Sequence, residues 1–271
     1  MSPYAGVAVG AVSGPMVVPG VAVPALDPGG FGAVTITKSI TISSEGFEAG
    51  VLVSGTNGIV VSTLATDVVI LRGIDFEGLG TGLNGVSFIG GGTLYVEKST
   101  IHHFTGNGIK FTPNTGAAAL FVNDVYIRNN GSGILVQPSS TASAKVSVSR
   151  SQVFQNAAAG FRADGTGSSG GIVASIADTV SSGNGGGGIV SFSQSGSAPT
   201  KVMIFNSVSS NNSTGLNANG AAAIMRVGLS TVSGNGVGIT ISNAATASTY
   251  SNNQIDDNTS PGQAIAPISP H

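Results

Sequence analysis

Short runs of alternating apolar and polar residues recur along most of this 271-residue chain. Residues 94–96, 146–148 and 239–241 are examples, and their apolar positions are Leu, Val or Ile. A period of two with many β-branched residues is typical of strands, whereas no segment carries a convincing helical stripe. Gly, Ser and Asn separate the runs. The pattern therefore predicts an all-β protein built from many short strands.

A second pattern, Gly followed by Ile, Val, Phe or Leu, recurs about once every two dozen residues. The eight pairs begin at Gly58, Gly85, Gly108, Gly133, Gly160, Gly188, Gly215 and Gly238. A fixed period of this size marks a solenoid, whose repeats bury their apolar faces by stacking. Three strand-sized pieces per repeat favour the coil of a parallel β-helix, and the frame of a leucine-rich repeat is missing.

We therefore predict a single right-handed parallel β-helix of about nine or ten coils over residues 26–258. Residues 1–25 would form an N-terminal lead or cap, and the Pro-rich residues 259–271 would leave the repeat as a C-terminal tail. An uncovered solenoid end is a sheet edge that can pair with another chain. A cap over the open end, or self-association through the ends, is therefore expected.

The repeats also share an apolar anchor, followed three residues later by a position that is often Asn. The predicted anchors are Phe76, Ile101, Ile127, Val153, Val180, Val208, Val232 and Ile255, and the Asn residues that follow them are Asn130, Asn156, Asn211, Asn235 and Asn258. Asn side chains stacked about 4.8 Å apart can hydrogen-bond along the axis. Asn and Gly also tolerate left-handed backbone, so we expect both these Asn residues and the Gly of the Gly-Ile pairs at tight corners.

A known group shares these features. Residues 26–40 read Leu-Asp-Pro-Gly-Gly-Phe-Gly-Ala-Val-Thr-Ile-Thr-Lys-Ser-Ile and lead into repeats of the form Val-x-small-Ser-x-Val-x-x-Asn-x-x-x-Gly-Ile. The chain resembles, over roughly residues 26–258, the bacterial right-handed parallel β-helix repeat proteins of the pectin-lyase-like superfamily. The resemblance implies the fold. It does not select an activity, because the superfamily includes lyases, hydrolases, esterases, epimerases, tailspikes and non-catalytic surface proteins.

Charge and cysteine content narrow the choice of partners. Charged residues make up 8% of the chain, the formal net charge is −2, and there is no Cys. This balance argues against nucleic acid as a partner, and it excludes disulfides and thiolate metal sites. No apolar run approaches the ~20 residues that span a bilayer, so no membrane span is expected. An extracellular or cell-surface location is expected, although residues 1–26 lack the basic start of a secretory signal.

One group of candidate site residues follows the Gly-Ile pairs. Lys110 and Arg162 occupy one outward position of this strand, and Gln137 and Asp164 occupy the position two residues further on. Counting repeats places all four within three adjacent coils. The resemblance implies that groove chemistry in this superfamily uses a basic residue beside an acid on such an exposed sheet. Lys110, Arg162 and Asp164 are therefore candidate catalytic residues.

A second group lies around the anchors. Lys98, Asp124 and Arg150 stand three residues before successive anchors, and Glu77, His102 and Arg128 stand one residue after them. The rows can be read as a patch that binds or processes an anionic glycan, with His102 as the acid or base. The alternating signs favour the other interpretation, in which the rows are surface salt ladders that keep the coils in register. His103 is expected to point away from His102 and to be packed or solvated.

The sequence predicts no cofactor. Ca²⁺ needs several converging oxygens, and only Asp256 and Asp257 are adjacent acids, so a Ca²⁺ site would have to be assembled from different coils. The Asn-Thr-Asp, Asp-Asp, Gly-His-Gly and Arg-Ile-Lys motifs of polygalacturonases are missing.

Three functions remain open. The first is a secreted or surface β-helix that contacts polysaccharide, or serves as scaffold or adhesin, without catalysis. The second is a polysaccharide lyase or glycoside hydrolase with a divergent site. The third is a tailspike-like or fibre-like assembly unit, which would need an apolar outer stripe such as Leu135 and Val190 suggest.

Overall fold

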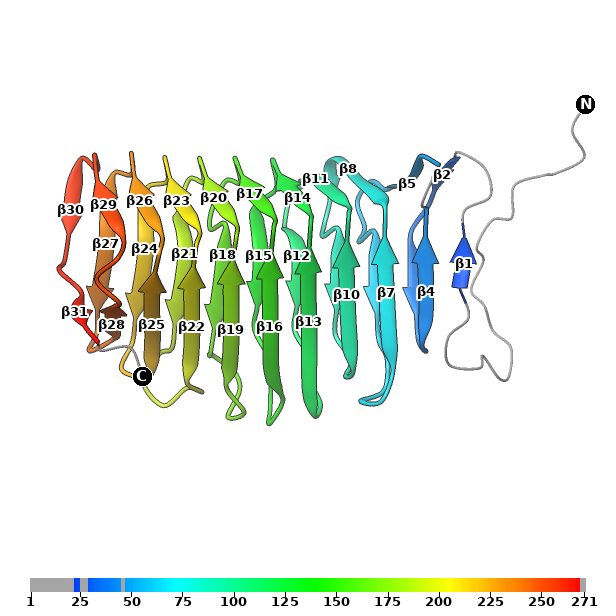
Figure 1. The fold of residues 1–271 in the computed structure, drawn as a ribbon. Coiled ribbons are helices and arrows are strands. Elements are labelled where there is room, and N and C mark those ends of the chain that lie inside the picture. The colour runs from blue at the N-terminus through cyan, green and yellow to red at the C-terminus, as the bar shows by residue number, and fades with distance from the viewer. Residues whose placement is uncertain (1–21, 25–28, 45–46, 269–271) are drawn as a thin grey trace, which may run out of the picture.

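The computed structural model describes residues 22–24, 29–44 and 47–268. This part of the chain forms strands and no helix, and the strands stack as successive coils along one axis (Figure 1). It therefore contains no helix that is long and apolar enough to cross a membrane.

The strands form three parallel sheets, named A, B and C here. Sheet A contains β1 (Ala22–Pro24), β4 (Ile40–Ser43), β7 (Val68–Arg72), β10 (Thr93–Glu97), β13 (Ala117–Asn123), β16 (Ser143–Ser149), β19 (Ile172–Ala177), β22 (Thr200–Phe205), β25 (Ala223–Gly228), β28 (Thr246–Thr249) and β31 (Ala266–Pro267). Sheet B contains β2 (Gly29–Phe31), β5 (Ala49–Leu52), β8 (Ile74–Gly82), β11 (Thr100–Phe104), β14 (Tyr126–Arg128), β17 (Gln152–Phe154), β20 (Val180–Ser182), β23 (Val208–Ser210), β26 (Thr231–Ser233) and β29 (Gln254–Asp256). Sheet C contains β3 (Val34–Ile36), β6 (Ile59–Val61), β9 (Val86–Phe88), β12 (Asn107–Phe111), β15 (Ser132–Val136), β18 (Phe161–Asp164), β21 (Gly187–Phe192), β24 (Thr214–Asn219), β27 (Val237–Ser242) and β30 (Ser260–Gly262).

Each coil visits the three sheets in turn. Every strand pairs with the strands three places before and after it, so β10 lies between β7 and β13. Sheets B and C have ten strands each, which agrees with the nine or ten coils expected. The prediction of a parallel β-helix is confirmed.

The core consists of apolar columns that run along the axis. Phe76, Ile101, Ile127 and Val153 are in register in sheet B, and all four are buried. Such stacking removes apolar surface from water, which stabilises the folded state by roughly 25 cal/mol for each Å² buried. Because each column belongs to many coils, burial in one coil depends on its neighbours.

A ladder of Asn side chains, buried in all but its last coil, lines the corner between sheets B and C. Each side-chain amide donates to the side-chain oxygen of the Asn in the next coil, at 2.9–3.2 Å. The ladder consists of Asn130, Asn156, Asn184, Asn212, Asn235 and Asn258. The expected Asn stack is therefore present, but the left-handed residue of this corner is the one before the Asn, for example Asn129 with φ 55°.

The predicted register is wrong by one residue in two coils. Val153 pairs with Ser181, Ser181 with Ser209, and Ser209 with Val232, so Val180 and Val208 are not the anchors. The ladder accordingly uses Asn212 and not Asn211. The polar ladder sets this register, because Ser181 donates to the Gly188 carbonyl oxygen at 2.8 Å and accepts from Asn184.

The Gly of the Gly-Ile pairs serves a different purpose from the one expected. None of the eight has a positive φ. At Gly133, an added Cβ would instead overlap the carbonyl oxygen of Gly160 and a methyl group of Val153. Glycine recurs here because adjacent coils approach closely, and the expectation of left-handed corners at these positions is wrong.

Both ends of the described chain extend the coil. β1 pairs with β4 inside the segment expected to be a lead, while residues 1–21 lie outside the described residues. Beyond residue 258, β30 pairs with β27 and β31 with β28, so the tail does not leave the repeat at that point. Pro261 and Pro267 in these last strands lack the N–H that an added strand would use.

Candidate functional site

An open, shallow groove lies at the edge of sheet C, where β12, β15 and β18 end. It has a volume of about 370 Å³, and its lining includes Lys110, Gln137 and Thr166. These residues come from the coils of β12, β15 and β18. The repeat count predicted the adjacent coils of Lys110 and Gln137, but Thr166 was not among the expected residues. No described residue forms an ion pair with Lys110.

Arg162 and Asp164 lie beside this groove but bind each other. Lys110 pairs with Leu135, and Leu135 with Arg162, which puts Lys110 roughly 10 Å from Arg162 along the axis. The Arg162 guanidinium donates to one Asp164 oxygen at 2.9 and 2.7 Å. It also lies 4.6 Å from the ring centroid of Phe192.

The other Asp164 oxygen is used as well. It accepts hydrogen bonds from the Thr166 backbone N–H at 3.0 Å and from the Thr166 hydroxyl at 2.5 Å. The Asp164 side chain is only 6% exposed. Gln137 donates to the Thr166 hydroxyl at 2.9 Å, which joins two coils at the groove. Asp164 therefore holds local structure together and offers no oxygen to a ligand.

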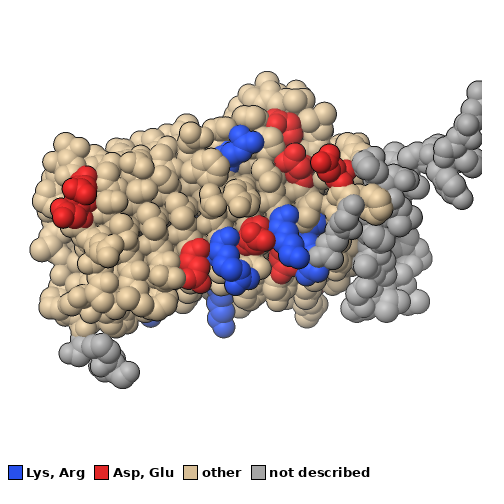
Figure 2. All heavy atoms as spheres, turned by 45° about the horizontal axis from the view of Figure 1, so that its top comes forward, with Lys and Arg blue, Asp and Glu red and all other residues tan. Residues whose placement is uncertain are grey.

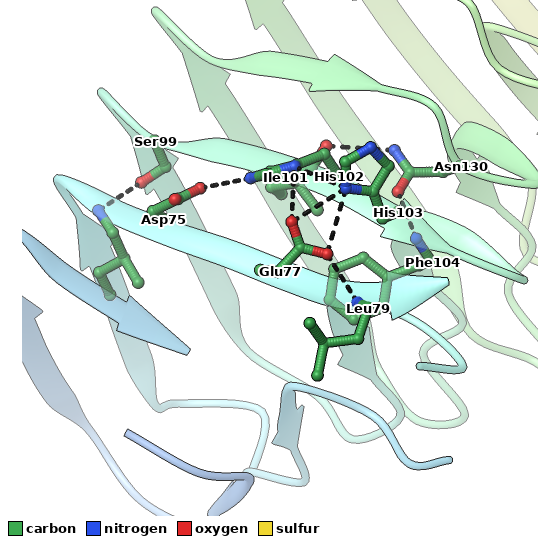
Figure 3. A network of polar contacts seen from close by, with 10 residues as sticks. Asp75, Glu77, Leu79, Ser99, Ile101, His102, His103, Phe104 and Asn130 are labelled. Carbon is green, nitrogen blue, oxygen red and sulfur yellow. Dashed lines mark hydrogen bonds and ion pairs between the residues drawn. The ribbon is translucent and has the colours of Figure 1, made fainter. Parts of the chain in front are cut away.

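His102 lies on a different face, in strand β11 of sheet B. Its Nε2 lies 2.8 Å from Asp75 Oδ1, and its Nδ1 lies 3.0 Å from Glu77 Oε2. The register of Glu77, His102 and Arg128 is the predicted one. Figure 3 shows the Glu77 carboxylate, from β8, pointing toward the two imidazoles of β11.

His103 joins this acid–histidine cluster, contrary to the expectation. Its Nδ1 lies 2.9 Å from Glu77 Oε2 and 3.2 Å from the Nδ1 of His102. The alternation of side chains fails because His103 has a left-handed φ of 60° and the register shifts between His102 and Phe104. A β-bulge re-aims a side chain in this way.

The Glu77 carboxylate is held in its ionised form. Burial opposes ionisation, but the hydrogen bonds from His103 and the Leu79 backbone N–H, with the charges of the two imidazoles, lower the pKa of Glu77 below its ordinary value. The cluster therefore places a carboxylate charge against two imidazole rings.

Charged residues continue around the cluster. A second groove, of about 720 Å³, is lined by residues that include Phe47, Glu48, Asp75, Lys98 and Thr100. On the face shown in Figure 2, most of the charged side chains gather on the N-terminal half, and acidic and basic ones alternate along part of it.

The predicted row of Lys98, Asp124 and Arg150 occupies the left-handed corner between sheets A and B, with φ values of 47–58°. Arg150 donates to the side chain of Asn123, and no described residue forms an ion pair with Asp124. The row is therefore not a continuous salt ladder.

Comparison with protein families gives one match, to the family described as "Right handed beta helix region", over residues 29–175. That range is more than half of the chain. The chain belongs to the right-handed β-helix family.

Two solved structures resemble this β-helix protein. The A-module of the Azotobacter vinelandii mannuronan C-5 epimerase AlgE6 matches with a TM-score of 0.63 and 17% identity, over 89% of this chain and 68% of the other. The A-module of AlgE4 from the same organism matches with a TM-score of 0.47 and 11% identity, over 93% and 91%. At these identities the likeness concerns the fold alone, a right-handed parallel β-helix. The search of curated proteins gave no match.

The four candidate residues of this β-helix protein thus fall on two faces. Lys110, Arg162 and Asp164 share sheet C, and His102 lies in sheet B. Sequence reasoning missed Asp75 and His103 as partners of His102. Repeat length gives no signal for them, because the repeat after Gly58 is as long as the repeats after Gly133 and Gly188.

Proposed function

We propose that this β-helix protein binds an acidic polysaccharide on sheet C without changing it covalently. The observation that carries the proposal is that Lys110, Gln137 and Thr166, from three successive coils, line one open groove. A cationic group beside uncharged hydrogen-bonding groups suits a chain that repeats both carboxylates and hydroxyls. The shallow groove suits a polymer that lies along the coils.

The state of the candidate acids and bases supports binding over catalysis. Both oxygens of Asp164 are engaged, and Arg162 is held by that carboxylate and by the Phe192 ring. At His102, both ring nitrogens face carboxylates and the side chain is 11% exposed. A general acid or base must reach the proton that it transfers. The lyase or hydrolase alternative therefore has less support.

The assembly alternative has less support as well. In the outward row of sheet C, Arg162 separates Leu135 from Val190, and Val190 is buried. On sheet A, Phe121 is followed in its row by Ser147. These two described rows are therefore not the apolar stripe that chains packed side by side would need.

The fold of a known polysaccharide enzyme adds a further reason. The neighbour AlgE6 is by its name an epimerase of mannuronan, so a polysaccharide ligand is compatible with this fold. Our proposal includes the extracellular or surface location expected from the sequence.

The test is a binding screen of the purified full chain against acidic and neutral polysaccharides, with and without Ca²⁺. Lys110→Ala should weaken binding of the acidic polymer at least tenfold. Lys145→Ala is the matched control, because Lys145 is an exposed lysine of β16 in sheet A. Equal loss in both variants, or none in Lys110→Ala, would contradict the proposal. Unsaturated uronates or new reducing ends would contradict its non-covalent part.

A further inference from the structure

We propose that Glu77, His102 and His103 form a binding site for a divalent first-row transition-metal ion. The three ligand atoms converge on one point at the outer surface of sheet B, and they are the Nδ1 atoms of both histidines and a carboxylate oxygen of Glu77. This site is independent of the polysaccharide groove, which lies on sheet C.

The distances between these atoms fit a metal ion. Glu77 Oε2 lies 3.0 Å from the Nδ1 of His102 and 2.9 Å from the Nδ1 of His103, and the two nitrogens are 3.2 Å apart. Simple geometry puts neighbouring ligand atoms about 3.0 Å apart in an octahedral site and about 3.3 Å apart in a tetrahedral site, for bonds of about 2.0–2.1 Å. The three atoms therefore already outline one face of a coordination polyhedron.

The groups around the ligands also match a metal site. Asp75 lies 2.8 Å from Nε2, the other ring nitrogen of His102, so a metal ion on Nδ1 would leave Nε2–H to donate to Asp75. The Leu79 backbone N–H donates to Glu77 Oε1 at 2.6 Å, which leaves Oε2 for the ion. Carboxylate–histidine–metal arrangements use partners of this kind to fix the tautomer and the ring.

The backbone keeps the two imidazoles together. Adjacent residues of a regular strand point to opposite faces, but His103 has a φ of 60° at the bulge of β11. Leu79, whose N–H holds Glu77, also has a left-handed φ, of 52°. Non-Gly residues in this region cost about 1–3 kcal/mol each and persist only where the surroundings impose them.

The donor set selects the class of metal. Two imidazole nitrogens and one carboxylate oxygen suit Zn²⁺, Ni²⁺, Cu²⁺ or Fe²⁺, whereas Ca²⁺ and Mg²⁺ need more oxygens. The His103 side chain is 42% exposed, so water can complete the coordination and the ion can enter from solvent. The site thus has three protein ligands and at least one open position.

The experiment is calorimetric titration of the tag-free full chain with Zn²⁺ after removal of metals by chelation. We expect one ion per chain. His103→Asn should abolish this binding, and Asn is chosen because it tolerates the left-handed backbone. Glu77→Gln should act in the same way. Asp75→Asn should weaken binding roughly 10–100-fold, as the loss of an outer-shell partner does.

The controls separate this site from other histidines and from misfolding. The chain has three histidines, so His271→Gln is the matched control and should bind as the wild type does. Circular dichroism must show that His103→Asn and Glu77→Gln are folded. Absence of binding to the folded wild type, or unchanged binding in both folded variants, would overturn the proposal. The Lys110→Ala variant, which alters the proposed polysaccharide site, should bind Zn²⁺ as the wild type does.

Discussion

The side-chain amide of Asn156 donates a 2.9 Å hydrogen bond to the side-chain oxygen of Asn184, one coil further along the axis. Asn184 also accepts from the backbone N–H of Asn156 and donates to Asn212. One amide thus binds two neighbouring coils through both backbone and side chain. Buried polar groups of this kind are costly when a partner is removed.

Replacing Asn184 should therefore weaken several coils at once. Asn184→Ala leaves the side chains of Asn156 and Asn212 and the carbonyl oxygen of Val153 without this partner. At about 1–3 kcal/mol for an unsatisfied buried group, we expect a loss of 3 kcal/mol or more. Urea unfolding followed by circular dichroism measures it. Asn114→Ala, at an exposed position, is the control and should change stability by less than about 0.5 kcal/mol.

A second prediction concerns the buried hydroxyl at position 181. Ser181 is 2% exposed and stands between Val153 and Ser209 in one column of sheet B. Ser181→Val should destabilise the protein by about 1–3 kcal/mol, although it adds apolar volume, because the Gly188 carbonyl oxygen loses its donor. Val180→Ser, at the half-buried neighbouring position, should lower the free energy of unfolding by less than Ser181→Val does. The reverse order of the two midpoints in thermal unfolding would show that Val at position 181 suits the column better.

This serine also marks where sequence reasoning stops. The Gly-Ile period and the alternation of short runs were enough to predict the β-helix, because every coil repeats the same burial. These patterns did not predict the register of every coil. Choosing the apolar residue as the anchor selects Val180 and not Ser181. The structure favours the register that keeps Asn184 in its ladder. The sequence of one repeat does not reveal which side chains form hydrogen bonds with the neighbouring coils.

The candidate sites show the same limit. The row of Lys110 and Arg162 was predictable, because it depends only on counting repeats. The partnership of His102 and His103 was not predictable, because regular alternation puts adjacent side chains on opposite faces. The left-handed φ of His103 breaks that rule. Its cause is tertiary, at the irregular pairing of β11 with the long strand β8.

A third prediction tests the role of glycine in the repeat. Gly133→Ala should destabilise the protein by about 1–3 kcal/mol, because the new methyl group would overlap the Gly160 carbonyl oxygen and Val153 in a close-packed core. Gly32→Ala is the control, since an added Cβ there has no heavy atom within 4 Å. Chemical denaturation of both variants measures the difference. Equal stability of the two would mean that the coils can separate to admit a methyl group.

The last prediction separates a structural from a catalytic role for the pair of Arg162 and Asp164. Asp164 is buried, so Arg162→Ala leaves its charge without its main partner and should cost about 2–3 kcal/mol of stability. The double variant Arg162→Ala with Asp164→Ala should lose less than the sum of the single changes, since it leaves no unpaired charge. Denaturant unfolding of the four proteins gives this coupling free energy.

Saccharide affinity gives the second readout of the same variants. If the pair only supports the groove, Arg162→Ala at a temperature where it stays folded should bind the acidic polysaccharide within a few-fold of wild type, whereas Lys110→Ala should not. Two results together would contradict a purely supporting role. The stability losses of the single variants would add up in the double variant, and Arg162→Ala would lose as much binding as Lys110→Ala. Arg162 would then contact the ligand directly, and its ion pair with Asp164 would open when the polysaccharide binds.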